Sequence, residues 1–294
     1  MDGVTSTLLD VGGPVRAVDH GGDGPLVLLI HGLGGSAENW DLAGPRLTAA
    51  GRVVAIDLVG FGDSEPGRRR PSVEDNALLV AEVIQYLGYD RATLVGNSMG
   101  GLVAMITATD HADRVDRVVL VDPALPMSRR HPPDVEVLTK LLGPLIPAVG
   151  VPVFRVYRAT HSPEEETMET LRMVAADPSA IPGWAVERLV EVNRRRRGRP
   201  WAIPAFLEAD RSIARYVLRP RRFSRLIHGI GAPVLLVHGS EDRLISVDSA
   251  RWAAAERPCW TYVEMAGVGH VPMLEAADQF VAVVGEWLGA AQEA

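Results

Sequence analysis

The residue best suited to covalent chemistry is Ser98, which stands in the sequence Gly96-Asn97-Ser98-Met99-Gly100. The apolar run Ala92–Val95 comes before it, and a helical pattern over Met99–Thr109 comes after it. A serine at a sharp strand-to-helix turn adopts a strained backbone conformation that exposes its hydroxyl above the sheet. Side chains at positions 96 and 100 would collide in so tight a turn, and glycine removes that collision. The pattern therefore predicts an exposed, reactive serine rather than a loose glycine-rich turn.

A serine hydroxyl is a poor nucleophile until a base takes its proton, and that base is usually a histidine held by a carboxylate. Asp242 follows the apolar run Val234–His238, and His270 follows the run Thr261–Glu264. Carboxylate and histidine thus come after the serine in the order Ser, Asp, His, each in a loop after a late strand. We expect His270 to be the base and Asp242 to orient it.

Other residues compete for these roles. Asp122 also follows a strand and could reach a histidine from there, whereas Glu241 adjoins Asp242 but would point in another direction. His31 and His238 end strands, so we expect both to be structural. Asp57 begins a glycine-rich loop, and we expect it to organise that loop by accepting hydrogen bonds from backbone amides.

Acyl transfer also needs donors for a developing oxyanion, and two backbone N–H groups usually supply them. One donor would be Met99, directly after the serine and at a helix N-terminus. The other would be Leu33, in the loop His31-Gly32-Leu33-Gly34-Gly35 after an early strand. This loop lacks the glycine and lysine spacing of nucleotide-binding loops, and the histidines are too scattered for a metal site. We therefore expect neither a cofactor nor a metal.

Composition narrows the class of protein. The chain has 294 residues, 47% of them hydrophobic, which is enough for one large domain or one domain with an insertion. A net charge of −7 argues against a general nucleic-acid binder. Cys259 is the only cysteine, and no signal peptide is recognisable. The run Leu26–Ile30 is too short to span a bilayer. We expect a soluble, cytoplasmic protein without a membrane span; oligomeric state stays open.

The elements that must position these residues alternate along the chain. Two adjacent early strands followed by strand–helix alternation predict a mostly parallel sheet with an antiparallel start and helices on both faces. The predicted strands are Thr5–Asp10, Pro14–Asp19, Leu26–His31, Val53–Asp57, Ala92–Val95, Val118–Asp122, Val234–His238 and Thr261–Glu264. The predicted helices of this part are Asn39–Ala49, Val73–Leu87 with Ser72 as N-cap, Met99–Thr109, Ser249–Ala255 and Ala277–Leu288.

The alternation stops between Asp122 and Pro233. Residues 123–232 carry 18 basic and 11 acidic residues, a net charge of +7, against −14 for the remainder. We interpret residues 123–232 as a helical cap inserted into a core domain of residues 1–122 and 233–294. Its basic run, Arg194–Arg197 with Arg199, is either a solvated helix end or an attraction site for an anionic substrate or surface. The cap's predicted helices are Val135–Leu142, Pro163–Ala176, Trp184–Arg196 and Pro200–Val217.

Five motifs in this order resemble the α/β-hydrolase superfamily over nearly the whole chain. They are His31-Gly32-Leu33-Gly34-Gly35, Asp57-Leu58-Val59-Gly60-Phe61-Gly62-Asp63-Ser64, Gly96-Asn97-Ser98-Met99-Gly100-Gly101, Gly239-Ser240-Glu241-Asp242 and Gly269-His270-Val271-Pro272. The resemblance implies an α/β fold: an eight-stranded, mostly parallel sheet flanked by helices, with a helical cap after the sixth strand. It also carries the roles of nucleophile, acid and base onto Ser98, Asp242 and His270.

The subfamily is less closely defined. Epoxide hydrolases and haloalkane dehalogenases are similar but place aspartate at the position of Ser98. The hydrolases that cleave carbon–carbon bonds of ring-fission products share the Gly-Asn-Ser-Met-Gly-Gly elbow, but they commonly have tryptophan where this chain has Val271. We expect a serine hydrolase that cleaves small, apolar carboxylic esters through an acyl-enzyme. A carbon–carbon bond hydrolase, a lactonase or perhydrolase preference, and a non-catalytic ligand-binding or signalling member are the alternatives.

Overall fold

One eight-stranded sheet organises the chain in the computed structural model, which describes residues 4–127 and 147–290. The order across the sheet is β1-β2-β4-β3-β5-β6-β7-β8. β1 pairs antiparallel with β2 and β2 antiparallel with β4, while every later pairing is parallel. The mostly parallel sheet with an antiparallel start is thus confirmed. The strands are β1 (Thr5–Asp10), β2 (Pro14–Gly21), β3 (Leu26–Ile30), β4 (Arg52–Ile56), β5 (Ala92–Asn97), β6 (Val115–Val121), β7 (Val234–Gly239) and β8 (Thr261–Met265).

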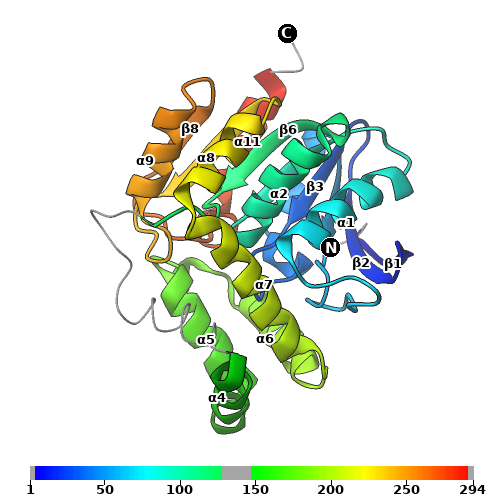
Figure 1. Ribbon diagram of the computed structural model, residues 1–294, viewed down its shortest axis with the longest axis vertical. Coiled ribbons are helices and arrows are strands. Elements are labelled where there is room, and N and C mark those ends of the chain that lie inside the picture. The colour runs from blue at the N-terminus through cyan, green and yellow to red at the C-terminus, as the bar shows by residue number, and fades with distance from the viewer. Residues whose placement is uncertain (1–3, 128–146, 291–294) are drawn as a thin grey trace.

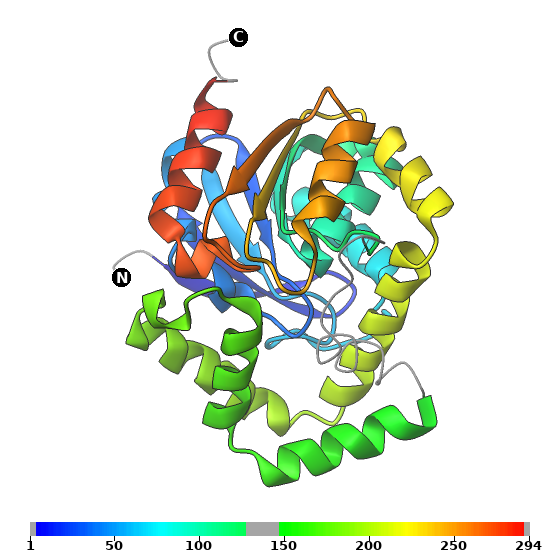
Figure 2. The ribbon, with the colours of Figure 1, turned by 90° about the vertical axis from the view of Figure 1, so that its left-hand side faces the viewer.

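The central strands are mostly apolar because helices cover both faces of the sheet. Every residue of β3 and β5 is buried. Figure 2 shows α11 (Ala277–Ala290) on one face, and α1 (Val73–Tyr86), α2 (Met99–Asp110) and α9 (Val247–Glu256) on the other. Ser72 caps α1 as predicted, since its hydroxyl accepts a hydrogen bond from Asp75 N at 3.2 Å. The carboxyl ends of the parallel strands therefore meet at one edge of a rigid sheet.

One predicted helix of the core is wrong. In place of a helix over Asn39–Ala49 the chain makes three short 3₁₀ turns, at Ala37–Trp40, Gly44–Arg46 and Thr48–Ala50. Gly44 and Pro45 explain the difference, because glycine weakens a helix and proline lacks the N–H that a helix interior needs. Two further 3₁₀ turns lie at Ala112–Arg114 and Pro178–Ala180, and the short helix α10 (Pro272–Glu275) follows His270.

Between β6 and β7, the described residues form five α-helices. They are α4 (Pro147–Thr160), α5 (Pro163–Val174), α6 (Gly183–Arg197), α7 (Ala202–Val217) and α8 (Pro220–Gly229). Figures 1 and 2 show α4, α5 and α6 beyond the sheet, while α8 lies beside α2. Three predicted helices correspond to α5, α6 and α7, whereas Val135–Leu142 lies outside the described residues. α4 and α8 were not predicted; Gly150 and Pro152 inside α4 weaken its helical pattern.

No helix within residues 4–127 and 147–290 is both long enough and apolar enough to cross a membrane.

Candidate functional site

Ser98 occupies a strained turn between β5 and α2. Its φ of 55° and ψ of −117° lie outside the regions that L-residues usually adopt. A Cβ on Gly96 would lie 2.3 Å from the carbonyl oxygen of Gly100, and a Cβ on Gly100 would lie 2.3 Å from that of Ile30. Both glycines are thus required by close backbone approach, as the sequence pattern predicts.

Two neighbouring strands hold this turn in place. The backbone N–H of Ser98 donates to Val121 O at 3.0 Å, and Ala124 N donates to Ser98 O at 2.9 Å. The Asn97 side chain donates to Val121 O at 3.1 Å and to His270 O at 3.0 Å. Asn97 therefore ties the serine turn to the loop that carries His270, a role that its place in the motif did not reveal.

The structure places Asp242 against His270. His270 Nδ1 donates to Asp242 Oδ2 at 2.7 Å, which leaves Nε2 as the proton acceptor of the ring. Both side chains are buried. The other oxygen of Asp242 accepts hydrogen bonds from Leu244 N at 2.8 Å and Ile245 N at 3.0 Å. Burial acts to raise the pKa of Asp242, but the neighbouring His270 and His238 outweigh it and hold that pKa below its ordinary value. Asp242 is therefore a carboxylate with a fixed orientation.

Asp122, the competing acid, lies beside Asp242 without a hydrogen bond to His270. Asp122 Oδ1 accepts from Gly239 N at 2.8 Å and lies 3.5 Å from His238 Nδ1. Burial raises the pKa of Asp122 well above its ordinary value, and the charge of Asp242 raises it further. Both effects favour the protonated form of Asp122. His238 Nε2 donates to Ile245 O at 2.9 Å, which agrees with a structural role.

Within residues 4–127 and 147–290, three of these buried groups lie close enough together to be considered as metal ligands. Ligand atoms of Asp122, Asp242 and His270 lie within 4.8 Å of one another. The His270 nitrogen and the Asp242 oxygen nearest each other are already joined by the 2.7 Å hydrogen bond. A metal at this place would have to break that bond, so the arrangement fits an acid–base pair better than a ligand set.

The loop after β3 lies against the serine turn. A Cβ on Gly32 would lie 3.0 Å from Ser98 Cβ, so glycine allows this approach. His31 Nδ1 donates to Gly32 O at 2.7 Å, and its Nε2 accepts from Leu58 N at 3.0 Å. Burial lowers the pKa of His31 to about 4, so His31 stays neutral and holds the loop. Leu33 lines the same pocket as Ser98. Met99 follows Ser98 directly and is the first residue of α2.

Asp57 organises the neighbouring glycine-rich loop, as expected. Its carboxylate accepts hydrogen bonds from Ala37 N at 2.7 Å and Asp63 N at 2.8 Å. Arg16 lies 3.3 Å from the same carboxylate and 2.9 Å from Glu38. This buried cluster lies beneath the loop that carries Leu33 and takes no part in the pocket lining.

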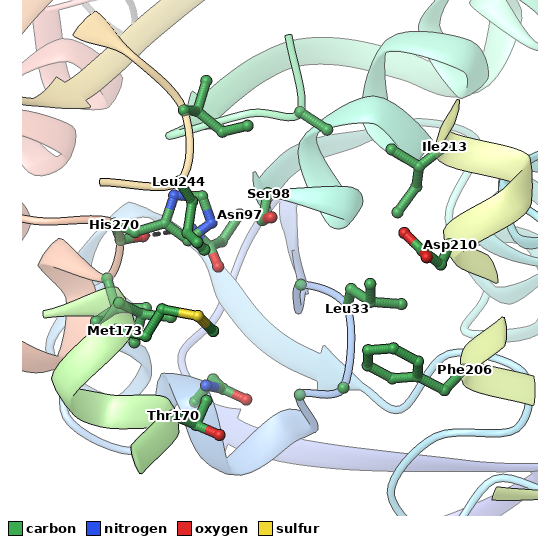
Figure 3. Close-up of a pocket in the computed structure, with 18 of the residues that line it drawn as sticks. Leu33, Asn97, Ser98, Thr170, Met173, Phe206, Asp210, Ile213, Leu244 and His270 are labelled. Carbon is green, nitrogen blue, oxygen red and sulfur yellow. Dashed lines mark hydrogen bonds between the residues drawn. The ribbon is translucent and has the colours of Figure 1, made fainter. Parts of the chain in front are cut away.

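A pocket of about 320 Å³ joins the predicted residues. Figure 3 shows Ser98 and His270 at one side and Leu33, Phe206 and Ile213 along the wall. The lining is mainly apolar and comes from the core loops and from α5, α6 and α7. In the part of the chain that the structure describes, no hydrogen bond joins Ser98 Oγ to His270, and such bonds often form only when substrate is bound. The structure thus brings Ser98, His270 and Leu33 to one cavity, with Asp242 behind the imidazole.

Sequence reasoning missed two residues at the site, Glu275 and Asp210. Glu275 accepts hydrogen bonds from Gly269 N at 2.9 Å and from Ala176 N at 2.8 Å. Asp210, on α7, lines the pocket and is 6% exposed. No spacing or motif marks either residue, since each acquires its role from a segment far away in the chain.

The arginines of the basic run, at the end of α6 and just after it, form ion pairs with acidic residues. Arg195 and Arg199 lie 3.3 Å and 3.1 Å from the Asp63 carboxylate, and Arg197 lies 2.8 Å from Glu166. Arg196 donates to Gly34 O in the loop beside the serine turn. These contacts favour a structural role for the run over attraction of an anionic surface.

Comparisons with known proteins agree with this geometry. A model of the alpha/beta hydrolase family matches residues 27–283. A 2-hydroxymuconate semialdehyde hydrolase of Pseudomonas sp. (strain CF600) is 28% identical over 94% of this chain and 90% of its own. A pimeloyl-[acyl-carrier protein] methyl ester esterase of Neisseria meningitidis serogroup C is 29% identical over 89% of this chain and 93% of its own. The solved structure of a membrane phospholipase A has a TM-score of 0.75 and 28% identity, over 99% of this chain and 87% of its own.

Proposed function

Because the chain belongs to the alpha/beta hydrolase family, we propose that it is a serine hydrolase that cleaves carboxylic esters through an acyl-enzyme. One observation carries this proposal: His270, hydrogen-bonded to Asp242 at 2.7 Å, lines one apolar pocket with the strained Ser98. A nucleophile, a base and an acid that orients the base form the arrangement that acyl transfer uses in unrelated folds.

In the proposed reaction Ser98 Oγ attacks the ester carbonyl carbon while His270 Nε2 takes the hydroxyl proton. The backbone N–H groups of Leu33 and Met99 stabilise the oxyanion that forms. The tetrahedral intermediate then expels the alcohol, which receives the proton from His270. Water attacks the acyl-enzyme with His270 again as base, and Ser98 is released with the carboxylic acid. Asp242 fixes the imidazole tautomer and stabilises its charged form throughout.

The substrate in this proposal is a small, mainly apolar ester. The apolar lining of the pocket supports the apolar character, and the relative named as a methyl ester esterase supports the ester bond. We propose residues 123–232 as the cap that covers the pocket, inserted into a core of residues 1–122 and 233–294. The helices α5, α6 and α7 of this segment contribute to the lining. The absence of a cofactor and of a metal, and the cytoplasmic location, stay predictions.

A second candidate function is hydrolysis of a carbon–carbon bond in a ring-fission product. The relative named as 2-hydroxymuconate semialdehyde hydrolase, which aligns with 94% of this chain, favours it. Val271, where those enzymes commonly have tryptophan, weighs against it.

The test is Ser98→Ala against wild type on nitrophenyl esters of graded chain length, with one ring-fission dienone beside them. An ester hydrolase should lose at least about a thousandfold in kcat with this substitution. Equal, slow hydrolysis by both proteins would support a non-catalytic member of the family instead. Faster turnover of the dienone than of any ester would favour the carbon–carbon bond hydrolase.

A further inference from the structure

Asp210 is a buried carboxyl without a partner in the wall of the pocket. It lies on α7, is 6% exposed, and its Oδ2 has no hydrogen-bond partner among the described residues. Figure 3 shows its carboxyl turned into the cavity between Ile213 and Phe206, across the pocket from His270. Phe206 and Ile213, the neighbours of Asp210 in this wall, are apolar, and Arg196 of the same lining donates to Gly34 O instead.

Asp122 Oδ2 also lacks a hydrogen-bond partner among the described residues, but Asp210 differs from Asp122 because it lines the pocket. Asp57 and Asp242 each accept two backbone N–H groups, and Asp122 accepts one from Gly239. The charged side chain nearest to Asp210 in sequence is Arg211, which lies 3.5 Å from Glu208 instead. Asp210 therefore has acceptor capacity that no described side chain uses.

Burial raises the pKa of Asp210 to about 7, and Arg211 offsets this only in part. An unpaired buried carboxyl weakens the folded state, and an apolar residue of similar size would fit this wall without that penalty. Buried, unpaired polar groups in the wall of a pocket are typical of ligand recognition. An acceptor in an apolar wall would select a ligand that brings a hydrogen-bond donor to it.

We propose that Asp210 recognises a hydrogen-bond donor, a hydroxyl or an ammonium group, at the far end of the substrate's acyl chain. This inference rests on the proposed ester hydrolysis and narrows its substrate class to ω-hydroxy or ω-amino acyl esters. The ester carbonyl lies at Ser98, the methylene groups lie along Leu33 and Phe206, and the terminal donor reaches Asp210. A plain alkyl ester leaves the Asp210 carboxyl buried and unpaired.

The experiment measures binding without turnover, in the Ser98→Ala background. Calorimetry gives the Kd of ethyl butanoate, hexanoate and octanoate, each as the plain, ω-hydroxy and ω-amino ester. At the chain length that fits, we expect a terminal donor to tighten binding about tenfold or more. Asp210→Leu should abolish this preference and tighten binding of the plain ester.

Asp210→Asn distinguishes the two kinds of donor. Its amide oxygen still accepts from a hydroxyl, so the ω-hydroxy preference should persist while an ω-amino preference is lost. Asp23→Leu, at an exposed loop position, is the control and should leave every Kd unchanged. The proposal is overturned if no chain length shows a donor preference, or if Asp210→Leu keeps one. Failure of ester hydrolysis would appear separately, as wild-type protein inactive on all the esters.

Discussion

The pKa values of the buried Asp122 and Asp242 are shifted in opposite directions, although the two residues follow neighbouring strands of the sheet. Asp242 receives two backbone N–H groups and the imidazole of His270, all of which favour its ionised form. Asp122 receives one backbone N–H and faces the charge of Asp242, which favours its protonated form. The two residues therefore have separate roles in the same small volume.

Replacing each acid by its amide tests this assignment. Asp242→Asn should lower kcat by about ten-thousandfold, because an amide no longer fixes the imidazole tautomer or stabilises its charge. Asp122→Asn should lower kcat less than about tenfold, since an amide resembles the protonated acid that the raised pKa of Asp122 favours. Steady-state kinetics on one ester compares them, and equal losses in the two variants would refute the assignment.

A second prediction at the residue scale concerns how Asp210 makes the stability of the folded protein depend on pH. Its pKa of about 7 in the folded protein exceeds that of an unfolded aspartate. Between these two pKa values the folded state binds the extra proton, so folded stability falls as pH rises and levels off above about pH 7. Across this pH range, the free energy of unfolding should fall by about 4 kcal/mol at most.

Urea denaturation of wild type and Asp210→Asn at about pH 5 and about pH 8 measures this pH dependence of stability. We expect the variant's advantage in free energy of unfolding to be larger at the higher pH. An advantage that does not change with pH would show that Asp210 keeps an ordinary pKa.

At the scale of elements, the loop that carries His270 is held from two sides. The Asn97 side chain donates to His270 O at 3.0 Å from the end of β5, and His270 N donates to Val174 O at 2.7 Å at the end of α5. Glu275 at the end of α10 bridges Gly269 N and Ala176 N. Core and inserted helices thus position the imidazole together.

Glu275→Leu should therefore lower kcat by about tenfold or more through a displaced imidazole, with a smaller change in KM. Glu275→Gln keeps one acceptor oxygen and should retain an intermediate kcat. Thermal unfolding of both variants serves as the control for folding. A loss of stability without a loss of kcat would mean that Glu275 supports the fold and not the base.

At the scale of the whole molecule, charge is divided between the two segments of the chain. Residues 123–232 have a net charge of +7 and the remainder −14. Arginines of residues 123–232 pair with acids outside this segment: Arg188 with Asp41 at 2.5 Å, and Arg199 with Asp63 at 3.1 Å. Partly exposed pairs contribute little individually, but several between the same two parts of the chain favour one mutual orientation.

Salt should therefore loosen the inserted helices from the core. Between about 0.05 M and about 0.5 M NaCl we expect KM for a neutral ester to rise in wild type. The double variant Arg195→Gln/Arg199→Gln should show a raised KM at low salt and little further change. Arg251→Gln is the matched control, because its partners Glu264 and Asp248 belong to the core as it does. If the KM of wild type for a neutral ester does not change with salt, the basic run does not hold these helices against the rest of the protein.

The sequence by itself determined the strands, the strained serine turn and the order of the motifs. These depend on local physics: apolar runs form buried strands, and the turn at Ser98 requires glycine at 96 and 100 wherever it lies in the fold. The same local reasoning failed for Asn39–Ala49, where Gly44 and Pro45 break the helix, and for α4, whose internal Pro152 hides it.

The tertiary structure alone decided which side chains meet. Asp122 and Asp242 follow adjacent strands, and the order of the motifs favours Asp242 over Asp122 as the partner of His270. The direction of each carboxyl, set by the backbone N–H groups around it, gives the 2.7 Å contact to Asp242. It also turned Asp210 into the pocket and gave the basic run its acidic partners. Contacts between segments far apart in the chain depend on how helices pack on the sheet, and residue spacing carries no record of that packing.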